Sequence, residues 1–178
     1  MQETTDPEKI AHKDTSDVLQ FLPALHAYAR SLTRQYGEAD DLVQTTLMKA
    51  IANYAQFRKG TNLRAWLFTI MRNTFLNEIK KRTREMPAAK DCASSMSTCA
   101  PAHDYHIEGQ RLIRAIARLP QHYREILVLV LVIGETYENA SAICGCEMGT
   151  VKSRLNRARA MLIEDLGSSD LDDFLATQ

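Results

Sequence analysis

The polar and basic residues of the segment 62–84 have the types and spacing that suit nucleic-acid binding. Steps of four, three and four residues separate them, which places them on one face of a helix. These residues are Asn73, Asn77, Lys80 and Arg84. Asparagine and arginine make directional hydrogen bonds to base edges, whereas lysine serves mainly as a charge for phosphates. The pattern predicts a nucleic-acid-binding helix, but a solvated helix face has the same pattern, so both interpretations stay open.

A second candidate surface follows a glycine-containing turn. The residues CGCEMG at 144–149 separate a short helix expected at 136–143 from a longer one expected at about 150–166. The apolar positions of the longer helix repeat at helical spacing and leave a set of polar and basic side chains largely free: Lys152, Ser153, Arg154, Asn156, Arg157 and Arg159. A helix-turn-helix places the start of its second helix in the DNA major groove. The pattern favours DNA binding, although two helices joined by a glycine turn also occur in other proteins.

Residues arranged for catalysis or metal binding are not evident. The sequence has no paired carboxylates, glycine-rich phosphate loop, or nucleophile with a base at readable spacing. Cys92, Cys99, His103 and His106 have the types of zinc ligands but not the spacings of a known finger. We therefore expect no enzyme activity, no cofactor and no metal, and interpret these four residues as part of a polar linker.

The charge distribution supports a polyanionic partner. The 178 residues carry 22 basic and 22 acidic side chains, yet 15–85 holds eleven basic against six acidic residues, and 111–165 holds eight against six. The longest apolar run, 126–133, is far shorter than the roughly 18 residues of a membrane span. Acidic residues near the N-terminus do not suit a secretory signal. We expect a cytoplasmic protein with two basic modules and no membrane contact.

Three helices and one loop are expected in the first module. The first helix begins near Pro23 and ends at Gly37, and the second runs from near Asp40 to about Asn53. The second helix is expected to bury four residues: Val43, Leu47, Ala50 and Ile51. A loop at 54–61 precedes the third helix, for which Asn62 is a candidate cap. Trp66 is expected in the core.

The second module is also expected to be helical. A helix is predicted at 105–119, and Pro120 separates it from the next. The apolar run 126–133 has no helical period and suits a buried strand or a helix buried on all sides; its helical neighbours favour the helix. The segment 86–103 is rich in small and polar residues and is interpreted as a linker. The fold class predicted is all-α.

Several motifs together resemble one family. The residues GTVKSRLNRARAML at 149–162 resemble the end of region 4 in extracytoplasmic-function (group IV) sigma factors, and LPQHYREIL at 119–127 resembles an earlier part of that region. In the first module, ADDLVQTTL at 39–47 is similar to region 2.2, and LRAWLFTIMRN at 63–73 to regions 2.3 and 2.4. The segment PALHAYARSL at 23–32 is most similar to the alphaproteobacterial general stress response (EcfG-type) subgroup.

The resemblance implies a sigma2 domain at 15–85, a linker at 86–104, a sigma4 domain at 105–166 and an acidic tail at 167–178. It implies a protein that binds core RNA polymerase, recognises the −10 and −35 promoter elements and initiates transcription of stress-response genes. The implied polymerase-binding residues are Asp40, Asp41, Leu42, Gln44 and Thr45. Those implied for the −10 element are Tyr54, Phe57, Arg58, Arg72, Asn73, Asn77 and Lys80. Those implied for the −35 element are Lys152, Ser153, Arg154, Asn156 and Arg157.

The family also implies a regulator. A small helical anti-sigma factor (NepR-type) is expected to hold the two modules together and cover their functional faces. Two alternatives remain open: a sigma-like decoy that titrates an anti-sigma factor, and a helix-turn-helix repressor that acts without polymerase. The decoy does not require the basic residues of 152–154, and the repressor leaves the first module unexplained.

Overall fold

The computed structural model describes residues 18–33, 36–58, 60–85 and 107–166. Within these ranges every regular element is helical, which confirms the predicted all-α class. None of the described helices is long and apolar enough to span a membrane. The predicted linker, the acidic tail and the four residues considered as zinc ligands all lie outside these ranges.

In the part of the first module that the structure describes, three helices with given bounds and a short 3-10 turn follow one another. These are α2 (Leu22–Leu32), α3 (Tyr36–Ala52), η1 (Tyr54–Gln56) and α4 (Leu63–Glu85). Pro23 lies in the first turn of α2, as expected. Gly37, however, lies in the first turn of α3 and does not end α2, so that boundary was wrong. The chain instead leaves α2 at Thr33, whose side-chain hydroxyl donates to the carbonyl of Ala29.

The three helices of the first module share a core. Its largest fully buried side chains include Leu25, Tyr28, Phe68 and Met71. Ile51 was expected in this core but is 53% exposed, because the buried face of α3 turns away from it after Ala50. Trp66 is half-buried and packs against the core.

Within the described residues 107–166, the second module contains four helices and a π-helical segment. These are α5 (Ile107–Arg118), α6 (Gln121–Leu127), η2 (Val128–Val132), α7 (Tyr137–Cys144) and α8 (Met148–Leu166). The apolar run 126–133 is helical, as its neighbours suggested, with the change to π geometry at Val128. It is not buried on all sides, since Val132 is 46% exposed.

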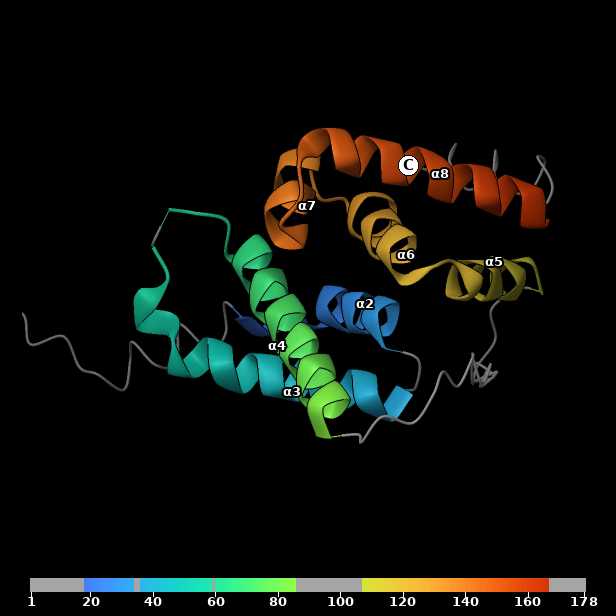
Figure 1. The fold of residues 1–178 in the computed structure, drawn as a ribbon. Helices are drawn as coiled ribbons and strands as arrows, with labels where there is room; N and C mark the ends of the chain where they lie inside the picture. The colour runs from blue at the N-terminus through green and yellow to red at the C-terminus, as the bar shows by residue number, and fades with distance from the viewer. Residues whose placement is uncertain (1–17, 34–35, 59, 86–106, 167–178) are drawn as a thin grey trace, which may run out of the picture.

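The two modules pack directly against each other. Helix α2 contacts α6 and η2, and α4 contacts α7. In Figure 1, α2, α3 and α4 form the lower part of the molecule, and α6 and α7 lie between them and α8. Buried residues from both modules form one continuous core. No local pattern in the sequence indicates this direct contact between the modules.

Candidate polymerase and nucleic-acid interfaces

The turn before α8 fixes the angle between α7 and α8. Thr136 caps α7 by accepting a hydrogen bond from the backbone N–H of Asn139 at 3.1 Å. Gly145 ends α7 with a left-handed φ of 59° that disfavours larger residues. The Ser141 hydroxyl then donates to the carbonyl of Cys146 across the turn. Both ends of α7 are therefore held by contacts between side chains and the backbone.

One face of α8 is apolar and the other is basic. Val151, Leu155, Ala158 and Leu162 are buried, as their spacing predicted. The exposed side chains on the opposite face are Lys152, Ser153, Asn156 and Arg157, while Arg154 and Arg159 are partly buried. Helix α8 packs on α5, α6 and α7, and in Figure 1 it lies on the side of the second module that faces away from α2, α3 and α4. Its basic face is exposed, so a DNA duplex can contact it.

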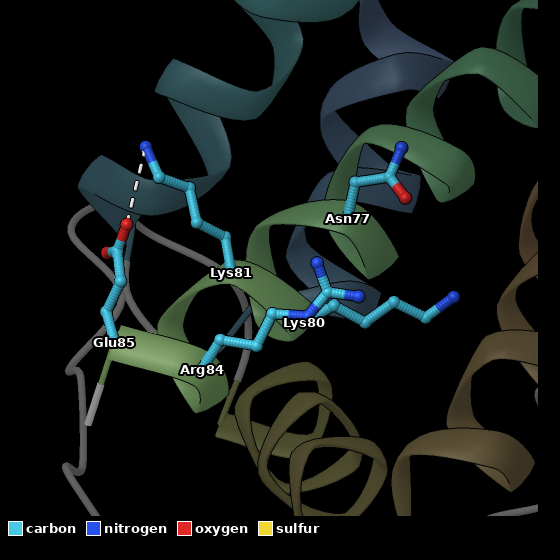
Figure 2. Close-up of a pocket in the computed structure, with 5 residues that line it drawn as sticks. All are labelled: Asn77, Lys80, Lys81, Arg84 and Glu85. Carbon is cyan, nitrogen blue, oxygen red and sulfur yellow. Dashed lines mark ion pairs between the residues drawn. The ribbon is translucent and has the colours of Figure 1, made fainter. Parts of the chain in front are cut away.

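The C-terminal half of α4 presents a second basic surface. Asn73, Asn77 and Lys80 are exposed, as the sequence pattern predicted. A hollow of about 550 Å³ is lined by five residues, whose side chains are drawn in Figure 2: Asn77, Lys80, Lys81, Arg84 and Glu85. Lys81 and Glu85 point toward each other and form an ion pair at 3.8 Å. Three cations against one carboxylate give this surface a net positive charge, which suits phosphates.

Three aromatic rings gather where η1 meets the start of α4. The ring centroid of Trp66 lies 5.3 Å from that of Phe57 and 6.5 Å from that of Tyr54. The three rings are each half-buried, and Arg58 beside them is exposed. Asn62 caps α4 by accepting from the N–H of Ala65 at 3.1 Å. Aromatic faces beside a cation are a surface on which unpaired bases stack.

The exposed side of α3 carries acidic, polar and apolar residues. Asp40, Asp41 and Gln44 are exposed and Thr45 is half-buried. Leu42 had been placed in the same binding set, but it is only 2% exposed and packs in the core, so it cannot present its side chain to a partner. This is a correction to the predicted site.

Two apolar residues of α3 were missed by the sequence reasoning. Met48 is 73% exposed and Ile51 is 53% exposed. Together with Asp41 and Gln44 they are separated by three, four and three residues, so all four lie on one side of the helix. The helical spacing of Asp41 and Gln44, continued toward the C-terminus of α3, leads to Met48 and Ile51. Exposed apolar groups of this kind suit a protein partner better than a nucleic acid.

A set of buried charges at the junction of the modules was also missed. One oxygen of Glu125, on α6, accepts hydrogen bonds from the Tyr28 hydroxyl and from Nε of Arg72, each at 2.7 Å. The Glu125 side chain is only 5% exposed. Burial, reinforced by the Glu125 charge, raises the pKa of Tyr28 well above its ordinary value. For Arg72, burial lowers the pKa, but the Glu125 charge and hydrogen bond outweigh it and the net pKa is raised.

Two more arginines join the modules. Nε of Arg64, on α4, lies 2.5 Å from a carboxylate oxygen of Glu135, whose side chain is fully buried. The other Glu135 oxygen accepts from the side-chain amide of Asn139 at 2.8 Å. Arg124, on α6, donates to the carbonyl of Ser31, on α2, at 2.6 Å. The contacts made by the two arginines across the modules join residues far apart in sequence, so no local spacing pattern could have indicated them.

Family comparisons agree with the division into two modules. Residues 18–85 match the family described as Sigma-70 region 2. Residues 109–162 match the family described as Sigma-70, region 4. These segments contain α2 to α4 and most of α5 through α8, respectively.

Individual relatives extend the likeness over most of the chain. The ECF RNA polymerase sigma factor EcfG of Rhodopseudomonas palustris is 45% identical over 158 residues, covering 89% of this chain and 87% of the relative. The ECF RNA polymerase sigma factor SigC of Mycobacterium tuberculosis is 33% identical, covering 76% of this chain and 74% of the relative.

Solved structures show the same likeness. The sigma factor RpoE of Bartonella quintana, in complex with the anti-sigma factor NepR, is 42% identical with a TM-score of 0.73, over 86% of this chain and 96% of that one. The anti-anti-sigma factor PhyR of the same organism, complexed with NepR, is 18% identical with a TM-score of 0.54, over 85% of this chain and 49% of that one. The second likeness concerns the fold alone.

Proposed function

Since this chain belongs to the extracytoplasmic-function sigma factors of the sigma-70 family, EcfG type, we propose specific roles for its three exposed faces. The chain is an RNA polymerase sigma factor that works with core polymerase at promoters. The proposal assigns α3 to core polymerase, α4 with its preceding loop to the −10 element, and α8 to the −35 element. We propose that the domains are 15–85 and 105–166, with 86–104 as the linker.

The exposed side of α3 is the proposed polymerase-binding face. Asp40, Asp41, Gln44 and Thr45 supply its polar part, and Met48 with Ile51 extends it with apolar surface. Protein interfaces combine an apolar centre with a polar rim, and this side of α3 has both. Leu42 supports the face from beneath by holding the helix on the core.

The start and the exposed side of α4 are the proposed −10 surface. An unpaired base is held by stacking and by contacts to its edge. Tyr54, Phe57 and Arg58 offer rings and a cation, and Arg72, Asn73 and Asn77 offer hydrogen-bond donors along the next turns. Lys80 and the basic hollow in Figure 2 extend the surface for the strand backbone.

The exposed face of α8 is the proposed −35 reader. Lys152 and Arg157 supply charge to phosphates, while Ser153, Arg154 and Asn156 have side chains that can hydrogen-bond base edges. The buried set that includes Val151 and Leu155 leaves this face pointing out of the second module. This outward basic face, on a helix whose segment matches sigma-70 region 4, is the observation that carries the assignment.

We also propose the regulator and the compartment. Because the 42% identical RpoE forms a complex with NepR, a NepR-type anti-sigma factor is the proposed regulator of this chain. Core polymerase and promoter DNA place its work in the cytoplasm, and polymerase supplies the catalysis of RNA synthesis. The proposal therefore gives the chain no enzyme activity of its own.

The decoy alternative has less support. PhyR shares the fold at 18% identity, whereas sigma factors reach 42% and 45%. A decoy also needs no exposed basic face on α8, and this chain has one. A repressor that acts without polymerase would leave the mixed polar and apolar face of α3 without a role.

Copurification with core polymerase separates the three functions. The tagged chain is mixed with purified core enzyme, and the complex is then tested on a promoter fragment. A sigma factor gives a stable holoenzyme that binds the fragment more tightly than either component. Binding to NepR without binding to core would indicate a decoy, and DNA binding that core does not change would indicate a repressor.

A further inference from the structure

We propose that two tyrosines outside α8 are positioning residues, which hold the cations of its basic face in place before DNA binds. Tyr123, on α6, holds Arg157 through its hydroxyl group. Tyr137, on α7, holds Lys152 over its ring. The inference rests on the proposed function, because both cations belong to the proposed −35 surface. It goes beyond that function, since it gives a role in DNA binding to two side chains that are not part of the basic face.

Lys152 and Arg157 lie at the two edges of the exposed face of α8. Each residue of an α-helix is rotated by about 100° from the one before it, so Asn156 and Ser153 lie about 40° and about 100° around the axis from Lys152. Arg157 lies about 140° from Lys152 in the same direction. The two short polar side chains therefore lie between the two long cations. Phosphate contacts fix the register and orientation of a protein on the duplex, so the positions of the two edge cations determine how the central residues meet the bases.

Arg157 is held through a hydroxyl group. Its Nη1 donates to the hydroxyl oxygen of Tyr123, with 3.5 Å between the two atoms. This hydrogen bond also raises the pKa of Arg157 above its ordinary value. Arg157 is exposed, whereas the Tyr123 ring packs against the core and its centroid lies 4.0 Å from that of the His122 ring. A side chain fixed by packing thus restrains one that lies in water.

Lys152 is held over the face of a ring. Its Nζ lies 6.0 Å from the centroid of the Tyr137 ring, which is within reach of a cation–π attraction. Tyr137 is the first residue of α7 and its ring packs against the core. The pKa of Glu138 is lowered, mainly by hydrogen bonds at the start of α7 and also by the charge of Lys152. The Lys152 ammonium therefore lies close to the first turn of α7.

Both tyrosines come from helices that pack directly on α8. Helices α6 and α7 each contact α8, and in Figure 1 α7 lies at the first turns of α8 and α6 lies beneath it. A tyrosine has only two side-chain torsions, so a ring anchored in the core is a rigid support. Lysine and arginine side chains, in contrast, lose much rotamer freedom when they contact a phosphate. Part of that freedom is already lost in the free protein if the tyrosines restrain them.

The size of the effect follows from the contacts. Restraining one flexible side chain before binding is expected to improve affinity about two- to tenfold. The hydrogen bond of 3.5 Å and the ring distance of 6.0 Å are both long, so neither tyrosine is expected to exceed that range.

The test uses the different groups through which the two tyrosines act. Tyr123→Phe removes only the hydroxyl and should weaken binding about two- to tenfold, whereas Tyr137→Phe keeps the ring and should preserve affinity. Tyr137→Leu removes the ring and should weaken binding by a similar factor. Each full-length variant is assembled with core polymerase, and fluorescence anisotropy measures its affinity for a labelled promoter fragment that the wild-type holoenzyme binds. Equal losses in Tyr137→Phe and Tyr137→Leu would overturn the role of the Tyr137 ring.

A double-mutant cycle separates positioning from other roles of Tyr123. In an Arg157→Ala background there is no cation to position, so Tyr123→Phe should have no further effect. A tyrosine that only stabilised the fold, or that contacted DNA itself, would lower affinity in both backgrounds. Salt dependence gives a second readout. Arg157→Ala should reduce the slope of log affinity against log salt by about 0.9, while Tyr123→Phe keeps the phosphate contact and should keep the slope.

Thermal melting followed by circular dichroism verifies that each variant is folded, and the Tyr123 cycle decides alone if Tyr137→Leu unfolds. A loss in Tyr123→Phe that disappears in the Arg157→Ala background supports the proposal. Unchanged affinity of Tyr123→Phe, or equal losses in both backgrounds, would overturn it, while a loss in Arg157→Ala would still leave α8 as the −35 reader. If neither Arg157→Ala nor Lys152→Ala weakened binding, the assignment of α8 to the −35 element would be contradicted, and the positioning roles with it.

Discussion

Arg72 and Tyr28 meet at one carboxylate oxygen of Glu125, each at 2.7 Å, although Glu125 lies 53 residues from the first and 97 from the second. The three residues come from α4, α2 and α6, so this single oxygen joins two helices of the first module to one of the second. Hydrogen bonds to a charged group are stronger than neutral ones, and burial keeps water from competing. The contact is a principal polar link between the modules.

The Tyr28 hydroxyl should make stability fall at alkaline pH. Its pKa is raised in the folded chain, so above about pH 10 the unfolded chain loses the phenolic proton while the folded chain keeps it. The unfolded state then binds fewer protons, and the free energy of unfolding decreases as pH rises. Burial also raises the pKa of Cys144, so that residue begins the decline from about pH 9.

Tyr28→Phe should weaken this alkaline decline. At neutral pH the variant should lose about 1.5 to 3 kcal/mol, because Glu125 loses one of its two donors. Urea denaturation at a series of pH values measures both effects. Tyr123→Phe, whose hydroxyl contacts Arg157 within the second module, is the control and should keep the wild-type pH profile. Identical profiles for Tyr28→Phe and wild type would contradict the role of the buried hydroxyl.

The Thr136 cap should contribute to the helix-turn-helix. Thr136→Ala removes the acceptor for the Asn139 N–H and should cost about 1 kcal/mol, measured by the shift of the denaturation midpoint. Thr136→Ser keeps the hydroxyl and should lie close to wild type. Equal losses in both variants would mean that the threonine methyl group, and not the cap, stabilises α7.

Sequence alone predicted the elements whose causes are local. The cap at Asn62, the buried spacing from Val151 to Leu162 and the exposed residues from Asn73 to Lys80 all follow from residues within a few positions of one another. Helical periodicity also predicted the basic faces of α4 and α8. These predictions succeeded because one helix turn determines them.

The sequence-based predictions were wrong or incomplete where tertiary contacts determine which residues are buried. Leu42 lies in the middle of a polar motif, yet the packing of α3 on α2 and α4 buries it. Ile51 was expected inside but is 53% exposed, because it points away from the buried face that Ala50 ends. The buried glutamates Glu125 and Glu135 gave no signal, because their arginine partners are 53 and 71 residues away. No spacing rule within a module reports contacts between modules.

The α3 face should control assembly with polymerase. Asp41→Arg combined with Gln44→Arg reverses the charge of an exposed surface and should abolish holoenzyme formation in native gel electrophoresis, with the fold unchanged. Glu85→Arg, an acidic-to-basic change at an exposed position of α4, is the control and should still assemble. Unchanged affinity of the double variant for core enzyme would exclude this face.

Substitutions on α8 should distinguish the residues that contact phosphates from those that contact base edges. Lys152→Ala should weaken binding to all duplexes alike and reduce the slope of log affinity against log salt by about 0.9. Arg154→Ala should cost about 1 to 3 kcal/mol on the specific −35 duplex and relax base preference. Anisotropy titrations on specific and random duplexes at several salt concentrations measure both. An equal loss on both duplexes would make Arg154 a phosphate contact.

Run-off transcription by purified core polymerase is the measurement that tests the central assignment most directly. The template carries a promoter bound by the holoenzyme, and a matched template has its −10 element scrambled. A sigma factor should give a defined transcript only when this chain and the intact promoter are both present, and Asp41→Arg with Gln44→Arg should abolish it. A chain that binds core polymerase but yields no promoter-dependent transcript from any template bound by the complex would contradict the account.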